Sequence, residues 1–302
     1  KQRFIDGLSR ILPEPQNAFL AGLLVGARRA IPEGLLAMFK ITGVTHIIAI
    51  SGFNISIITR ILGRFIQTHF GRRAALLITV LVVCGFVVIT GAQASVVRAA
   101  IMGVVLVVGL NLGRMSRAFN ILVLAGAGMV ALNPQVLIFD VGFQLSFLAT
   151  AGLIFFAETL ERAFRKIPEI FELRSILAAT LSAQIFVWPL LIYNFDQLSL
   201  ISPLVNILIL PIIPLTMLFG FISGLLALLW QPIAYLTVWV TWAFLTYQIQ
   251  VVQFFAKIPF ASVNIKNLPL SALASYYVIL AAVVFVLQAR NRNLTMEKFR
   301  NP

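Results

Sequence analysis

The residues of this chain that are best suited to chemistry lie in one apolar stretch, 42–62, with the sequence TGVTHIIAISGFNISIITRIL. A polar group left unsatisfied in hydrocarbon is costly. Polar side chains at membrane depth therefore usually face protein or water, and they often mark a pathway. Five small or polar residues stand out in the stretch: His46, Ser51, Gly52, Asn54 and Ser56.

Two interpretations of these residues remain open. Ser51 and Gly52 weaken the helix where the middle of a membrane would fall, and a broken helix is tolerated there only if its freed backbone groups find partners or line a cavity. Gly52 and Ser56 also have the spacing that lets two helices pack closely. His46, taken alone, is most simply a ring hydrogen-bonded to a neighbouring helix. The residue types fit helix packing and pathway lining equally well.

A second group of polar residues begins two predicted helices near one membrane surface. Arg98 has a simple explanation as a cation that extends to the interface, and Asp140 has one as an acid at a helix N-terminus. Gln144 shares a helix face with Asp140, and Ser146 follows on the same helix. An ion pair between Arg98 and Asp140 would form a latch at the mouth of a pathway, and the sequence does not choose among these roles.

The third group lies in SPLVNILILPIIPL, residues 202–215. Proline in a membrane helix often only kinks it. Three prolines within twelve residues, beside an amide, instead predict an unwound or re-entrant segment near a cavity. The residues are Pro203, Asn206, Pro211 and Pro214.

Catalysis is not expected. Asp140 is the only acidic residue that we place close to a membrane segment, so no carboxylate pair is predicted there. The two histidines, His46 and His69, and the single Cys84 form no recognisable metal site. Ser51 and His46 lack an orienting carboxylate, and no glycine-rich phosphate loop is present. We therefore predict no enzyme activity, no metal and no cofactor.

The composition indicates a membrane protein. Of 302 residues, 60% are hydrophobic and only 11% are charged, whereas soluble domains are nearer one quarter charged. The net charge of +13 suits anionic lipids and also a polyanion such as nucleic acid. It also fits the excess of Lys and Arg on the cytoplasmic side of membrane proteins.

These features predict an all-α, polytopic integral membrane helical bundle with about nine crossings and re-entrant or broken helices. We expect interfacial amphipathic helices on the periplasmic side over 1–41, a transmembrane domain over 42–290, and a basic cytoplasmic tail over 291–302. The alternation of basic loops places the N-terminus outside and the C-terminus in the cytoplasm. The expected crossings are 42–62, 74–91, 96–112, 118–132, 141–157, 174–193, a broken 199–230, 233–256 and 270–289. The chain starts without Met, as expected of a fragment of a longer protein.

Four blocks of this sequence resemble the competence domain of the ComEC family, the inner-membrane DNA-uptake channel of natural transformation. GVTHIIAISGFNISII is similar to H-L-L-A-I-S-G-L-H-V, and SVVRAAIMG to P-S-x-x-R-A. NPQVLIFDVGFQLSFLATAGLIFF resembles D-P-x-x-x-x-D-x-G-F-Q-L-S-F. WPLLIYNFDQLSLISPLVNILILPIIPL resembles P-L-x-x-x-x-F…S-P-x-x-N-x-x-x-x-P. The blocks occur in the family's order.

The resemblance implies a channel that passes single-stranded DNA from the outer face to the cytosol. His46, Ser51, Gly52 and Asn54 would then line the path. Asn54 stands where the family commonly has His, so no protonatable role carries over to it. The outer mouth would be formed by Arg98, Asp140, Gln144 and Ser146, and the path would be shaped by Pro203, Asn206 and Pro211.

The resemblance also implies partners: membrane lipids, a periplasmic DNA receptor, and a cytosolic DNA motor or helicase. Many family members carry OB-like and metallo-β-lactamase-like domains, and neither pattern occurs in this sequence. A nuclease would thus be a separate domain or protein. The alternatives are a secondary transporter of a small anion or lipid, with Asp140 as the coupling site, and a non-conducting scaffold.

Overall fold

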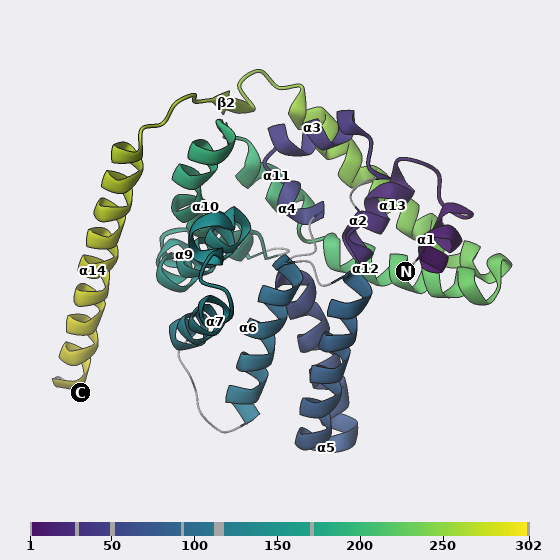
Figure 1. Ribbon diagram of the computed structural model, residues 1–302, viewed down its shortest axis with the longest axis horizontal. Coiled ribbons are helices and arrows are strands. Elements are labelled where there is room, and N and C mark those ends of the chain that lie inside the picture. Colours follow the sequence, from purple (N-terminus) through teal and green to yellow (C-terminus); the bar gives the residue numbers. More distant parts are fainter. Residues whose placement is uncertain are drawn as a thin grey trace.

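The computed structural model describes residues 2–27, 30–48, 52–91, 94–111, 118–169 and 172–300 (Figure 1). Most of these residues are helical, and the described part contains two strands of three residues each. The predicted all-α class is confirmed. The helices form two regions, which we call the central core and the outer bundle.

The central core combines the first four helices with three helices from late in the chain. Leu8, Phe19 and Phe39 are fully buried in its hydrophobic cluster, and the two Phe rings lie 5.2 Å apart. In Figure 1 the N-terminal end of the chain lies beside α12. The helices are α1 (Gln2–Ser9), α2 (Gln16–Val25), α3 (Glu33–Ile41), α4 (Thr45–Ile48), α11 (Ser202–Ile209), α12 (Ile213–Leu229) and α13 (Gln231–Ala256).

Helix α2 lies inside the central core, within the segment 1–41 for which the sequence predicted interfacial helices. Nine of its ten residues, Asn17 to Val25, are buried in the central core. Its sequence, QNAFLAGLLV, is apolar almost all the way round, and a helix of that kind is buried rather than laid on a surface. The domain boundary at residue 41 stays a prediction.

The outer bundle contains the remaining helices. Its longest, α5, consists of two helices that meet at Gly71, where φ is 83° and ψ is 171°. The basic segment between 62 and 74, expected to be a loop, is thus helical on both sides of one glycine turn. The helices are α5 (Gly52–Thr90), α6 (Ala94–Asn111), α7 (Ala118–Leu132), α8 (Val136–Phe139), α9 (Val141–Ala163), α10 (Leu173–Phe195) and α14 (Leu270–Arg300).

Three described helices are long and apolar enough to cross a membrane: Val141–Ala163, Leu173–Phe195 and Leu270–Leu287. They match three of the expected crossings. The expected break in 199–230 is also present, because α11 and α12 meet at 49°. Other described apolar helices are too short, and α13 is long enough but contains many Thr and Gln residues. About nine crossings are therefore not confirmed.

Helix α9 runs to Ala163, six residues beyond the expected end at 157, and so contains Glu158 and Glu161. The expectation that Asp140 is the only acidic residue close to a membrane segment is therefore wrong. Sequence reasoning ended the helix with its apolar run, whereas the backbone stays helical until its charges reach the surface.

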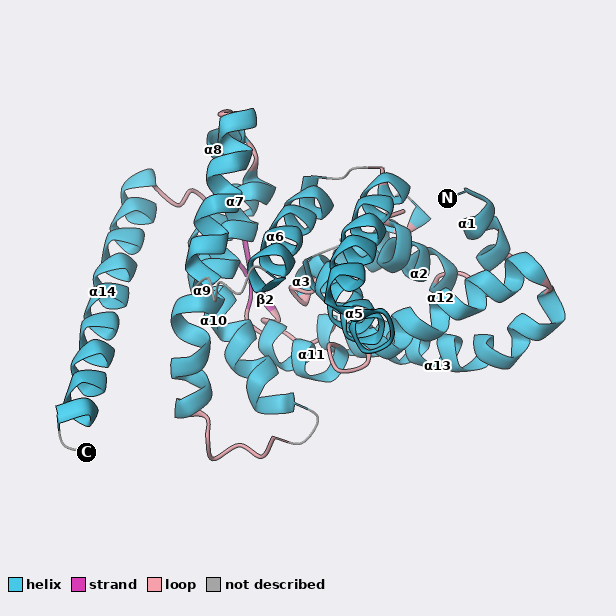
Figure 2. Cartoon of the chain, turned by 90° about the horizontal axis from the view of Figure 1, so that it is seen from below, coloured by secondary structure: helices cyan, strands magenta, loops and turns pink. Residues whose placement is uncertain are grey.

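A short strap ties the end of α10 to the start of α14. Strand β1 (Gln197–Ser199) pairs antiparallel with β2 (Ser262–Asn264), and the Ile265 amide donates to the Asp196 carbonyl at 3.0 Å. Helices α11–α13 therefore leave the outer bundle and return to it at one point. Beyond the strap, α14 stands at the edge of the molecule (Figures 1 and 2).

Candidate functional site

Arg98 of α6 and Asp140, which precedes α9, form an ion pair. The Arg98 Nη1 and Asp140 Oδ2 atoms are 3.1 Å apart, and the side chains are 5% and 32% exposed. Arg98 is thus buried and does not extend to the interface. Asp140 also caps α9, because its Oδ1 accepts a hydrogen bond from the Phe143 amide at 2.9 Å. The ion pair and the helix-terminal contact that the sequence left open are both present, and the role of the pair as a latch at a pathway mouth stays a prediction.

Neighbouring residues leave space for the pair and brace it. A Cβ atom on Gly142 would lie 3.2 Å from Arg98 Nη2, so the glycine makes room for the guanidinium group. The Gln144 side-chain amide donates to the carbonyls of Leu137 and Ile138 at 2.9 and 3.0 Å. Gln144 therefore holds α8 against α9. Ser146 is half-buried in α9, and its carbonyl accepts a bond from Thr150.

A ladder of polar side chains joins α10 to α11. Gln184 Nε2 donates to Ser202 Oγ at 2.8 Å, and Asn206 Nδ2 lies 3.4 Å from Thr180 Oγ1. Each helix contributes two residues four apart, so the two rungs are antiparallel and one helical turn apart. The ladder lies near the middle of α10 and connects the outer bundle with the central core.

The ladder continues to the turn before α4. Ser202 Oγ donates to the Gly43 carbonyl at 3.4 Å. A Cβ atom at Gly43 would lie 2.7 Å from the Cβ atoms of both Ser199 and Ser202, and its φ of 70° also favours glycine. The stretch 42–62 and the proline-rich stretch are therefore in direct contact.

Three oxygens next to this contact are buried without a hydrogen-bond partner among the described residues: Gln184 Oε1, Asn206 Oδ1 and Ser199 Oγ. Asn206 and Ser202 are 4% and 2% exposed. Buried polar groups are normally satisfied, so these oxygens are acceptors for water or for a polar ligand. Among the described residues of the candidate pathway, Arg98 Nε is likewise buried without a hydrogen-bond partner.

The other predicted site residues are placed as follows. His46 lies in α4 and is exposed, although Ile47 and Ile48 beside it are buried. Ser51 lies outside the described residues. Gly52 and Asn54 lie in the first turn of α5, and their side chains are outside the description. Pro203 occupies the first turn of α11, and Pro211 lies between α11 and α12.

Helix α14 is attached to α10 at a proline that the sequence analysis passed over. Pro189 has no amide hydrogen, so the Ile185 carbonyl loses its helical donor. The Tyr276 hydroxyl donates to that carbonyl, and the Tyr277 hydroxyl donates to the carbonyl of Phe186, both at 2.9 Å. Neighbouring helices commonly satisfy backbone groups freed by proline in this way.

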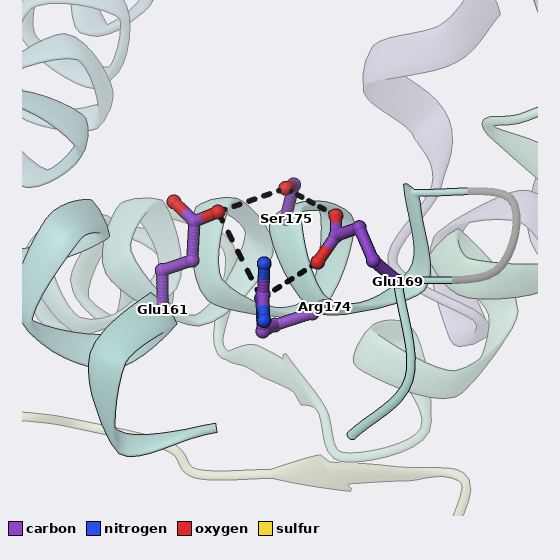
Figure 3. Close-up of polar contacts among 4 residues, drawn as sticks. All are labelled: Glu161, Glu169, Arg174 and Ser175. Carbon is purple, nitrogen blue, oxygen red and sulfur yellow. Dashed lines mark hydrogen bonds and ion pairs between the residues drawn. The ribbon is translucent and has the colours of Figure 1, made fainter. Parts of the chain in front are cut away.

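At the opposite end of α10, a polar cluster closes the connection to α9 (Figure 3). Arg174 Nε lies 2.6 Å from Glu169 Oε2 and 3.9 Å from Glu161 Oε1. Ser175 Oγ lies within hydrogen-bonding distance of both carboxylates, at 2.7 and 3.1 Å. Arg162 is paired with Glu158. Two of the basic residues around this connection, Arg162 and Arg174, are therefore paired with carboxylates. In the described part of the chain, no group of His, Cys, Asp and Glu is suited to a metal ion.

Sequence reasoning missed Thr180, Gln184, Ser199, Ser202 and the tyrosine pair. A signal for the ladder was present, since both helices carry polar residues at i and i+4 in otherwise apolar segments. No such signal specified Gly43, because its role depends on a contact about 160 positions away.

These features define a helical protein with apolar, membrane-type helices and a polar helix junction. A family model described as "Competence protein" matches residues 23–290, and the chain belongs to this family. The chain is 30% identical over 231 residues to ComE operon protein 3 of Bacillus subtilis (strain 168). The match covers 76% of this chain and 29% of that protein, so the chain spans under a third of this relative's length. No solved structure matches.

Proposed function

We propose that this chain is the membrane part of a DNA-uptake system and passes single-stranded DNA from the outer face to the cytosol. The observation that carries the proposal is membership of the competence family over residues 23–290. The resemblance of four blocks to the ComEC competence domain leads to the same activity. Nothing in the proposal requires the chain itself to be an enzyme.

The ladder between α10 and α11, with the unpaired oxygens beside it, forms a polar junction that supports a pathway next to these helices. Amide and hydroxyl oxygens at membrane depth are costly unless they meet a donor. Gln184 Oε1 and Asn206 Oδ1 are acceptors of this kind, and a hydrated polymer rich in N–H donors would supply partners. The contact between Gly43 and Ser202 joins the start of the stretch 42–62 to the start of the proline-rich stretch.

The outer ion pair is better suited to bracing than to ion coupling. Asp140 is held both by Arg98 and by the Phe143 amide, so its carboxylate is committed to its neighbours. This arrangement favours the channel over a secondary transporter that uses Asp140 as its coupling site. On this proposal the driving force comes from a cytosolic motor, and a periplasmic receptor delivers the DNA.

The test is uptake of end-labelled double-stranded DNA by cells that lack the gene, with and without the restored wild-type gene. Nuclease-protected DNA outside the inner membrane is separated from single-stranded label in the cytosol. We expect the deletion strain to retain DNA outside and to show no cytosolic label. Unchanged cytosolic label would refute the channel and make small-anion transport the working hypothesis.

Variants locate the pathway once the deletion has a phenotype. Asn206→Leu and Asn54→Ala should reduce cytosolic label about tenfold or more while surface-bound DNA and membrane expression stay normal, because substitutions of this kind remove polar partners from a pathway. Leu236→Ala, at a strongly exposed position of α13, is the matched control. Equal uptake by all three variants would exclude the junction as part of the path.

A further inference from the structure

An apolar groove of about 670 Å³ lies between α14 and the helices α7, α9 and α10. This volume is within the range of sites that hold small ligands. Phe119, Phe155 and Phe186 form one wall, and Leu280, Ala281 and Val284 of α14 form the other. Tyr277 also contributes to the lining, but its hydroxyl is already bonded to the Phe186 carbonyl.

The groove exists because α14 touches the rest of the protein so little. Only 6% of its apolar span is buried, compared with 39% for α10. The two tyrosine hydroxyls fix its distance from α10, and the side chains between them do not close the space. A groove of this kind between membrane helices is open to hydrocarbon, and its lining offers no charged group to a polar ligand.

Positive charge lies beyond one end of the groove. Arg165 and Lys166 follow α9, are exposed, and belong to none of the ion pairs found in the described part of the chain. Phe155 lies eight residues before the end of α9, a rise of about 12 Å along the helix. On the opposite wall, the sequence of α14 continues past the groove to Arg290 and Arg292.

We propose that this groove is a binding site for an anionic phospholipid. One acyl chain lies against Phe119, Phe155 and Val284, and the phosphate lies at Arg165 and Lys166. Apolar grooves between membrane helices with basic residues at the headgroup level suit anionic lipids. The bound chain supplies the packing that α14 lacks against its own protein. The site does not depend on the proposed DNA pathway.

The experiment measures lipid retention by the full purified chain with native mass spectrometry. Dioleoyl phosphatidylglycerol and dioleoyl phosphatidylcholine, which have the same acyl chains, are supplied in equal amounts. We expect the wild type to retain phosphatidylglycerol about tenfold more than phosphatidylcholine, because two cations face the headgroup. Equal retention of both lipids would overturn the proposal.

Two variants separate the acyl-chain site from the headgroup site. Ala281→Trp fills the groove and should abolish retention of both lipids. Ile279 lies on the opposite face of α14 and is 64% exposed, so the Ile279→Trp variant should still retain them. The double variant Arg165→Gln, Lys166→Gln should lose the preference but still retain lipid. Retention of phosphatidylglycerol by Ala281→Trp at the wild-type level would refute the groove. If that variant fails to fold, an unchanged preference in the double glutamine variant refutes the site instead.

Discussion

The central core and the outer bundle differ in how much of each helix touches protein. In the described residues, the hydrophobic cluster of the central core has 25 buried members, and that between α5 and α6 has five. In the central core, helices as short as α4 are held by neighbours on several sides. In the outer bundle, α14 leaves nearly all of its span uncovered. The core therefore depends on side-chain fit along whole helices, whereas the bundle leaves more of its apolar surface uncovered.

Removing core volume should have the largest effect. Leu20 is fully buried and lies over Gly220 of α12, where an added Cβ would be 2.5 Å from Leu20 Cδ1. Leu20→Ala should lower the free energy of unfolding by about 3 kcal/mol, because the cavity cannot fully collapse. Titration with denaturing detergent, followed by helical signal, measures this change. Leu236→Ala, at a 78%-exposed position, should change it by less than about 0.5 kcal/mol.

Breaking the ion pair between Arg98 and Asp140 comes next. Asp140→Asn keeps an acceptor for the α9 amide but leaves the buried Arg98 guanidinium without its carboxylate. Loss of one partner of a fully buried pair costs about 3–5 kcal/mol. We expect about 2 kcal/mol, since Asp140 is one third exposed. The same titration also measures the double variant. Adding Arg98→Met to Asp140→Asn should restore most of the lost free energy of unfolding. Additive losses would mean that the pair contributes no coupling.

The contact between α9 and α10 shows how the outer bundle achieves close packing at one position. A Cβ on Gly152 would lie 2.3 Å from the Ser182 carbonyl oxygen, which is backbone and cannot rotate away. Gly152→Ala should therefore push the helices apart and cost about 1–3 kcal/mol. Gly128→Ala is the matched control, because no heavy atom lies within 4 Å of its Cβ position. Equal stability of the two variants would contradict the contact.

Weakening the attachment of α14 should have the smallest effect on stability. Tyr276→Phe removes the donor to the Ile185 carbonyl and should speed backbone amide exchange in α14, with a stability loss of about 1 kcal/mol. Pro189→Ala restores the amide that this carbonyl lacks. In the Pro189→Ala background, Tyr276→Phe should therefore cause a clearly smaller loss of stability. An undiminished cost would show that the proline does not create the need for the tyrosine.

Much of this architecture could be predicted from the sequence because hydrophobic runs and proline clusters are local signals. The helices around 141–157, 174–193 and 270–289 and the break near Pro211 are examples. The charges of Arg98 and Asp140 suggested a pair because each is costly alone in a membrane.

Other features depend on contacts between distant parts of the chain. The burial of α2 and the rungs at Gln184 and Thr180 are set by tertiary packing, which periodicity does not report. The helical hairpin at Gly71 was missed because its basic residues resembled a loop. The pathway roles of Asn54 and its neighbours stay predictions.

The pairing of α1–α4 with α11–α13 also has a consequence for biosynthesis. About 150 residues separate Ile48 from Ser202 along the chain, and ribosomes add roughly 5–20 residues per second. The first four helices must therefore wait on the order of ten seconds or more for the partners that bury Leu20 and Phe39. During this delay they require shelter by the bilayer or by the insertion machinery, and slowing translation after residue 48 should increase their degradation.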